Sequence, residues 1–161
     1  MGIKIIFLDV DGVLNTRKTI RRLNCCNEFI FVDTRKILRL RDIVERTGAK
    51  LVLSSTWRFG AERDALYFER EALRELVAEF RRVRCPLWFD ITPYFPHAKR
   101  WQEINAWLML HPEVDEFVIL DDLGDELKPF ADQLVLTNKL EGLTKERAEL
   151  AISMLGENEN E

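Results

Sequence analysis

Two carboxylates near the start of the chain have residue types and a spacing suited to catalysis or metal binding. Asp9 and Asp11 follow an apolar run at 5–8 and precede Gly12. Such a run is typical of a buried strand in a parallel sheet. Residues two apart in a strand point to the same side, so both carboxylates should project from its carboxyl end, where open α/β sheets bind ligands. Because the two charges repel each other, the pair requires a cation or a shared proton.

Polar residues end two further apolar runs. Ser54 and Ser55 follow one of them, and Asp121 and Asp122 follow another. Parallel strands bring their carboxyl ends to one edge of the sheet, so these side chains should meet the first pair there. Mg²⁺ prefers carboxylate, water and phosphate oxygens, and it would neutralise the repulsion among the carboxylates. The predicted cofactor is therefore Mg²⁺, and its candidate ligands are Asp9, Asp11, Asp121 and Asp122.

A phosphorylated substrate suits this set of groups. A phosphate monoester carries about two negative charges near neutral pH, so its approach to a carboxylate nucleophile requires a metal ion, a hydroxyl and a basic side chain. Ser54 supplies the hydroxyl, and Lys99 or Arg100 supplies the basic group at a predicted helix N-terminus. The backbone N–H groups of that terminus also favour an anion. A covalent aspartyl-phosphate route with acid–base catalysis is consistent with these residues.

Strands and helices alternate along the chain, which predicts how these side chains are positioned. Strands are expected at 3–9, 50–53, within 85–91, 117–120 and 134–136. Helices are expected at 34–47, 61–83, 99–110, 125–132 and 145–155. This order predicts an α/β, three-layer Rossmann-like fold with a mainly parallel five-stranded sheet and helices on both faces. We expect one domain over 1–155 and a disordered acidic tail over 156–161.

Composition restricts the class of protein. The chain has 161 residues and a net charge of -4, which gives no global basic field for non-specific nucleic-acid binding. A nucleic-acid substrate stays possible but is not favoured by that charge. The three cysteines lack the spacing of a disulfide framework or a zinc site. With no apolar run of membrane-spanning length, we expect a cytoplasmic protein with no membrane partner, and the sequence indicates no oligomeric state.

Four segments resemble, in order, the motifs of haloacid dehalogenase-like (HAD) phosphohydrolases. The DxDGV segment at 9–13 is similar to their first motif, and the apolar strand ending in Ser54 is similar to their second. Lys99 and Arg100 fit the basic third motif, and the strand that ends in two aspartates at 118–122 is similar to the fourth. The segments at 54–58 and 104–108 further resemble a small capless branch that includes domains of nucleic-acid repair proteins.

The resemblance implies roles for the carboxylates. Asp9 would be the nucleophile and a metal ligand. Asp11 would be the general acid and base, with its backbone carbonyl on Mg²⁺. Asp122 would be a metal ligand, and Asp121 either a second ligand or a group that orients one.

The resemblance also implies the phosphate-binding groups. Ser54 and Ser55 would bind phosphoryl oxygens. The basic residue of the third motif would stabilise the transferring group, and its spacing from the following helix favours Arg100 over Lys99. For Arg58 the sequence leaves two interpretations, contact with substrate phosphate or a solvated helix position.

The connections at 15–33 and 92–98 are too short to form a cap domain. We therefore expect an open site with at most a short flap over 15–33, which suits phosphate groups on large molecules. The basic residues of this flap could attract an anionic substrate or simply solubilise a loop. They are Arg17, Lys18, Arg21 and Arg22.

Three functions follow from these observations. The leading one is a Mg²⁺-dependent phosphatase that hydrolyses a phosphate monoester of a small molecule or phosphoprotein through an aspartyl-phosphate. The second is a nucleic-acid end-processing phosphatase that acts on 3′-phosphates, and the third is a non-catalytic binding protein with the same fold.

Overall fold

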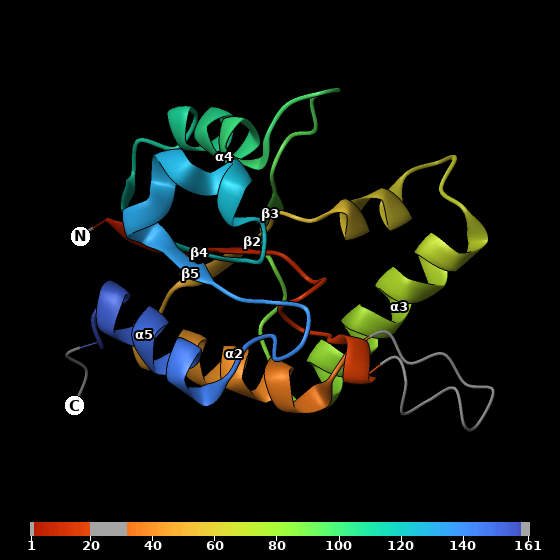
Figure 1. The fold of residues 1–161 in the computed structure, drawn as a ribbon, viewed down its shortest axis with the longest axis horizontal. Coiled ribbons are helices and arrows are strands. Elements are labelled where there is room, and N and C mark those ends of the chain that lie inside the picture. The colour runs from red at the N-terminus through yellow and green to blue at the C-terminus, as the bar shows by residue number, and fades with distance from the viewer. Residues whose placement is uncertain (1, 20–31, 159–161) are drawn as a thin grey trace.

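The computed structural model describes residues 2–19 and 32–158. Within them, five strands form one all-parallel sheet in the order β3-β2-β1-β4-β5 (Figure 1). The strands are β1 (Ile3–Leu8), β2 (Lys50–Leu53), β3 (Asp90–Ile91), β4 (Val114–Asp121) and β5 (Leu134–Leu136). The predicted α/β fold with a five-stranded sheet is confirmed, and β1 is its central strand.

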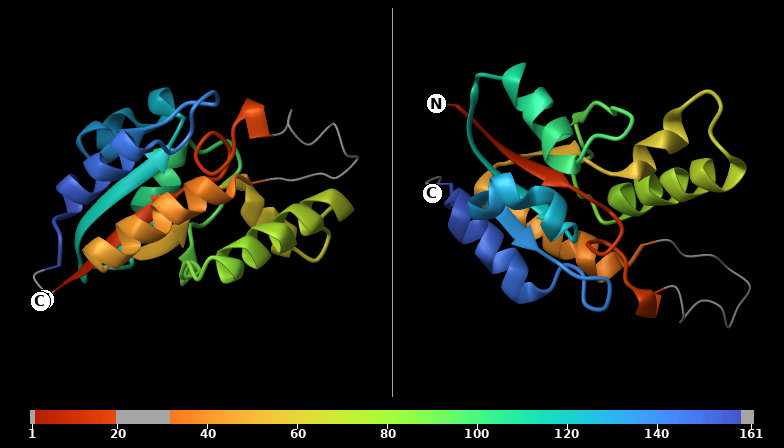
Figure 2. Two further views of the ribbon diagram at one scale, coloured as in Figure 1. Left: turned by 90° about the horizontal axis from the view of Figure 1, so that it is seen from below. Right: turned by 45° about the horizontal axis from the view of Figure 1, so that its top comes forward.

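Helices cover both faces of the sheet. α2 (Thr34–Thr47) and α5 (Lys145–Leu155) lie along one face, and α4 (Arg100–Met109) lies along the other with the 3-10 segment η2 (Gly124–Gln133) (Figure 1). A second 3-10 segment, η1 (Thr56–Ala61), leads from β2 to α3 (Tyr67–Arg82). η1 and α3 reach past the carboxyl ends of the strands in all the views of Figures 1 and 2.

The two faces of the sheet carry separate apolar clusters because side chains alternate along each strand. Ile6 and Leu8 of β1 are buried in the cluster that includes residues of α2, α3 and α5. Ile5 and Phe7 are buried in the cluster that includes residues of α4 and η2. From Ile5 to Leu8, β1 is buried on both sides and apolar, as is typical of a parallel sheet covered by helices on both faces.

Local signals fix where several helices begin and end. The Asp33 carboxylate accepts a hydrogen bond from the Arg35 amide at 3.0 Å and caps α2, and Gly48 ends that helix with a φ of 68°. The Thr144 hydroxyl accepts from the Arg147 amide at 3.3 Å and caps α5. Both helices therefore have the bounds predicted from the sequence, 34–47 and 145–155.

The helix predicted at 61–83 is wrong at its beginning. The chain forms η1 and a turn first, and α3 starts only at Tyr67. The reason is close packing between η1 and α3, since a Cβ added at Gly60 would lie 2.5 Å from the Glu69 carbonyl oxygen. Two strand lengths also differ from the prediction: β3 contains only Asp90 and Ile91, and β4 begins earlier, at Val114.

Backbone hydrogen bonds continue past the strands and hold the polar residues at one edge. The Asp9 amide donates to the Leu120 carbonyl at 3.0 Å, and the Ser54 amide donates to the Leu8 carbonyl at 2.8 Å. The Thr137 amide likewise donates to the Asp121 carbonyl at 3.0 Å. The residues that follow β1, β2 and β4 therefore share the carboxyl edge of the sheet.

No inserted domain occurs in the described parts of the connections at 15–33 and 92–98. The predicted flap lies partly outside those parts, since residues 20–31, with Arg21 and Arg22, are not described. Of the predicted tail, Glu157 forms an ion pair with Arg46, and Asn158 donates to the Arg46 carbonyl at 2.8 Å. The residues at 159–161 lie outside the description, where disorder stays a prediction. None of the described helices has the length and apolarity needed to cross a bilayer.

Candidate active site and metal centre

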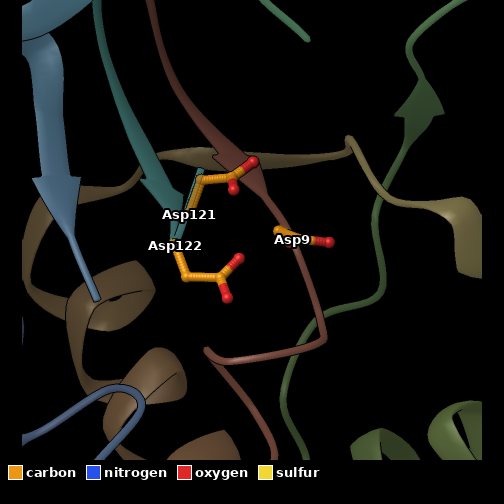
Figure 3. Close-up of side chains that lie close together, drawn as sticks. All are labelled: Asp9, Asp121 and Asp122. Atoms are coloured by element: carbon orange, nitrogen blue, oxygen red, sulfur yellow. The ribbon is translucent and has the colours of Figure 1, made fainter. Parts of the chain in front are cut away.

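Three carboxylates meet at the carboxyl edge of the sheet and form an acidic trio: Asp9, Asp121 and Asp122. Figure 3 shows Asp9 directly after β1, and Asp121 and Asp122 at the end of the neighbouring β4. Each offers one oxygen, and these oxygens lie within 4.8 Å of one another. Asp9 and Asp121 are buried, whereas Asp122 is half-buried. The predicted meeting of the two strand ends is therefore observed.

Burial makes the charged form of this trio costly. It raises the pKa of Asp9 to about 6, although the nearby Arg100 guanidinium and the Ser55 hydroxyl act in the opposite direction. Burial and the charge of Asp9 raise the pKa of Asp121 to about 8, again against Arg100. Burial also raises the pKa of Asp122, and Lys139 opposes that shift. Without a further cation, the three groups cannot all be ionised at low cost.

The trio fits a hard divalent cation. One oxygen of Asp121, Oδ1, accepts from the Leu123 amide at 2.9 Å. The other, Oδ2, is buried and accepts no hydrogen bond from any described residue, though the Arg100 Nε lies 3.7 Å away. A buried carboxylate oxygen in this position, with two further carboxylates beside it, is the oxygen-rich environment that Mg²⁺ selects.

Asp11 lies apart from the trio, although the sequence placed it among the candidate metal ligands. Its exposed carboxylate accepts a hydrogen bond from the Asn15 amide group at 2.8 Å. Asn15 in turn accepts from the Gly12 amide at 3.0 Å. The Asp11 side chain is thus not part of the acidic trio, and its roles as a proton carrier and as a metal contact through its backbone carbonyl stay predictions.

Gly12 is required by close packing against the trio. Its φ is 74°, a conformation that residues with a Cβ rarely adopt. A Cβ there would also lie 2.6 Å from the Asp122 Oδ2. The glycine of the DxDG segment therefore lets the chain turn directly beside a carboxylate of the acidic trio.

The two serines after β2 have different positions. The Ser54 hydroxyl is buried and has no hydrogen-bond partner among the described residues. The Ser55 hydroxyl is hydrogen-bonded to Asp9 and accepts from the Trp57 amide at 3.3 Å. Ser54 is thus the serine with an unused hydroxyl, whereas Ser55 orients Asp9 and begins η1.

Of the two basic residues predicted for the third motif, Arg100 is the one that contacts the trio. It is buried at the start of α4, donates to the Ser54 carbonyl and forms the ion pair with Asp121. Its backbone amide donates to Glu126 at 3.0 Å. Lys99 is exposed at the N-cap of α4 and forms no ion pair with the trio among the described residues.

The structure contradicts one of the two interpretations of Arg58, the solvated helix position. Arg58 is buried and forms an ion pair with Glu103 at 3.0 Å, and it also donates to the Thr92 hydroxyl at 3.1 Å. Its guanidinium lies over the rings of Phe59 and Tyr94. Arg58 therefore joins η1 to α4 rather than facing water, and its contact with substrate phosphate stays a prediction.

The sequence analysis missed two groups at the same edge. Thr137 follows β5, is buried, and its hydroxyl has no hydrogen-bond partner within the described parts of the chain. The rule that found Ser54, a polar residue directly after a strand, would have found it. Lys139 acts on Asp122 from the loop after β5, and no sequence signal marks it.

One known protein family matches most of the chain. The family described as the HAD domain in Swiss Army Knife RNA repair proteins matches residues 5–148. Neither the curated proteins nor the solved structures yielded a match. The matched region contains the acidic trio, the DxDG turn, Ser54 and Arg100. The chain therefore belongs to the family of HAD domains found in Swiss Army Knife RNA repair proteins.

Proposed function

We propose that this domain is a Mg²⁺-dependent phosphatase that hydrolyses a phosphate monoester through a phosphorylated Asp9. The observation that carries the proposal is the acidic trio, because Asp9 is buried beside two further carboxylates and a buried arginine. Asp9, Asp121 and Asp122 would hold the ion. When bound, Mg²⁺ would supply the positive charge that keeps these carboxylates ionised and offsets the charge of the phosphoryl group.

Asp9 and Asp11 have different roles in the two chemical steps, phosphoryl transfer and hydrolysis. An ionised oxygen of Asp9 attacks phosphorus, and the bond from phosphorus to the leaving oxygen breaks. Asp11 gives a proton to that oxygen. Asp11, now ionised, then takes a proton from a water molecule whose oxygen attacks the same phosphorus, which releases inorganic phosphate and the free Asp9 carboxylate.

Neighbouring groups support these steps. Ser55 and the Val10 amide, whose distance to Asp9 Oδ1 is 2.8 Å, orient the nucleophile. The free hydroxyl of Ser54 and the guanidinium of Arg100 would bind the phosphoryl oxygens, on which negative charge is spread in the transition state. The hydrogen bond from Asn15 orients Asp11.

We propose a terminal phosphate of RNA or DNA as the substrate class. The family match to domains of RNA repair proteins supports it over the small molecule or phosphoprotein favoured from the sequence. The structure adds a cleft of about 510 Å³ near the segment after the DxDG turn, lined by the basic residues Lys18, Arg35, Lys36 and Arg39. Burial makes the ionised form of the trio unfavourable, and a non-catalytic role is less consistent with such a cluster.

Phosphate release with and without Mg²⁺ tests the catalytic proposal. The protein is expected to release phosphate from 3′- or 5′-phosphorylated oligonucleotides only when Mg²⁺ is present. The control is Asp9→Asn, which keeps the shape of the side chain and removes the nucleophile. Equal release by this variant, or release that is independent of metal, would contradict the mechanism.

A panel of phosphorylated metabolites and a phosphopeptide tests the substrate class. Higher kcat/KM for the oligonucleotides would support the nucleic-acid assignment. A clear preference for a metabolite or the phosphopeptide would overturn that assignment and leave the mechanism at Asp9 intact.

A further inference from the structure

An aromatic pocket opens beside the proposed proton carrier. It has a volume of about 320 Å³, and Asp11 and Asn15 form one of its sides. Trp57 and Phe59 of η1 and Phe68 of α3 line the rest, together with Glu69. The pocket is thus shared between the catalytic edge of the sheet and the arm made of η1 and α3.

We infer that this pocket binds the terminal nucleobase of the strand whose end phosphate is removed. The inference rests on the proposed function, because Asp11 protonates the leaving oxygen there. The leaving group must therefore lie on the side of Asp11, and the pocket is the space that Asp11 lines. For a phosphorylated strand end, the leaving group is the terminal nucleoside.

The lining matches a base better than other leaving groups. Unpaired bases bind proteins by stacking on aromatic side chains, and three aromatic residues face this pocket. The carboxylate of Glu69 disfavours a leaving group that carries a further phosphate at this position. An uncharged aromatic base satisfies both conditions, and the polar edges of Asn15 and Thr56 offer hydrogen-bonding groups to it.

The walls of the pocket differ in how firmly they are held. Trp57 packs against the main apolar cluster, and Phe59 contacts the Tyr94 ring edge-on at 5.0 Å between centroids. The side of Phe68 is open, since this residue is 60% exposed in the first turn of α3. An exposed phenylalanine beside a fixed aromatic wall gives an entering base a second surface to stack on.

A comparison of two substrates tests the inference by kinetics. One is a 5′-phosphorylated trinucleotide, and the other is the same molecule with an abasic sugar at its phosphorylated end. The ratio of their kcat/KM values measures what the terminal base contributes. Phe68→Ala is expected to lower this ratio about 5- to 150-fold, since a stacked base contributes about 1–3 kcal/mol. Phe68→Trp should restore it.

Tyr67→Ala is the matched control. Tyr67 is the adjacent aromatic residue, is 80% exposed and does not line the pocket, so its removal should leave the ratio at the parent value. An unchanged ratio in Phe68→Ala, or an equal fall in Tyr67→Ala, would overturn the inference. Thermal unfolding of each variant establishes that it is folded.

A binding measurement separates this inference from the proposed function. A trinucleotide with 2-aminopurine at its 5′ end and no phosphate should lose fluorescence on binding, because the base stacks in the pocket. The dissociation constant should rise at least fivefold in Phe68→Ala and stay constant in Tyr67→Ala. Quenching without phosphatase activity would disprove the catalytic proposal alone. Activity with no quenching, or with quenching that Phe68→Ala leaves unchanged, would disprove the base pocket alone.

Discussion

At the scale of single residues, the site depends on carboxylates that are costly to bury. Asp121 is fully buried, and one of its oxygens lacks a hydrogen-bond donor among the described residues. Its raised pKa expresses that cost, since burial and Asp9 both oppose its ionisation. A cation bound by the trio would remove the cost, so metal binding and stability should be coupled at this residue.

The variant Asp121→Asn tests the coupling. A neutral amide removes the buried charge, so the metal-free protein at pH 8 should melt about 2–6 °C higher than the parent. The rise in melting temperature caused by Mg²⁺ should become smaller, because a ligand is lost. Differential scanning calorimetry with EDTA and with Mg²⁺ gives both quantities.

Asp125→Asn is the control for that experiment. Asp125 is an exposed carboxylate that pairs with Lys128 at 3.0 Å and lies outside the trio. Its replacement should leave the effect of Mg²⁺ unchanged. If Asp121→Asn kept the full effect of Mg²⁺, Asp121 would not be a ligand.

The pH dependence of the metal-free protein is a second prediction at this scale. The pKa values of Asp9 and Asp121 are raised from 3.8 to about 6 and about 8. At pH values between about 4 and about 8, the folded protein therefore binds more protons than the unfolded chain. These two groups therefore contribute fully to the free energy of unfolding below about pH 4, and their contribution is lost as the pH rises to about 8. Urea unfolding in EDTA between pH 5 and 8 measures it, with other groups adding to the profile.

Added Mg²⁺ should reverse much of that loss, because the ion binds the ionised carboxylates and binds more tightly as pH rises. The variant Asp121→Asn should show a flatter profile in EDTA. A parent protein whose metal-free stability rose steadily from pH 5 to 8 would contradict the assigned direction of both shifts.

Sequence reasoning succeeded for residues that directly follow strands. The parallel sheet places Asp9 and Asp121 at one edge without any knowledge of side-chain contacts. The period of two did not extend to Asp11, because β1 ends at Leu8 and Asp11 lies in the turn that follows. Sequence reasoning failed for Arg58, since nothing in the sequence pairs this residue with Glu103, which lies on another helix. Long-range pairs of this kind depend on how η1 packs, and local patterns carry no information about it.

At the scale of elements, η1 and α3 form an arm that is anchored in the main apolar cluster through Leu76 and Phe80 of α3. Gly60 allows η1 to approach α3 closely, and the Arg58–Glu103 ion pair ties η1 to α4. The apolar period along α3 predicted a helix, but its start depends on this packing. The arm places Trp57 and Phe59 beside Asp11, so its tethers also shape the aromatic pocket.

The variant Glu103→Ala should loosen this arm. It leaves the buried guanidinium of Arg58 without its carboxylate, which typically costs about 3–5 kcal/mol, and it also removes the acceptor of the Phe95 amide. The melting temperature should fall by roughly 6–20 °C. Fluorescence-monitored thermal unfolding measures the change.

Glu71→Ala is the matched control, because Glu71 pairs with the exposed Arg74 at 2.8 Å on the surface of α3. An exposed pair contributes about 0–1 kcal/mol, so this variant should melt within a few degrees of the parent. Similar shifts in the two variants would show that the buried pair does not hold the arm.

At the scale of the whole molecule, the net charge conceals a local cluster of basic residues. The chain carries a charge of -4, yet basic side chains gather in the cleft beside the segment that follows the DxDG turn. The loop after β5 connects the two regions: Leu140 and Glu141 line the cleft, and Lys139 acts on Asp122. The cleft brings together residues of the segment after the DxDG turn, of α2 and of the loop after β5, and a sum over the sequence conceals this local charge.

The dependence of oligonucleotide binding on salt tests this local field. Lys18 is exposed and lines the cleft, so Lys18→Ala should weaken binding of a phosphorylated oligonucleotide to Asp9→Asn protein by up to about fivefold. The slope of log affinity against log salt should decrease by about 1, because one phosphate contact is lost. Lys50→Ala is the control, since Lys50 starts β2 at the opposite end of the sheet. Equal weakening by both variants would show that overall charge, rather than the cleft, attracts the strand.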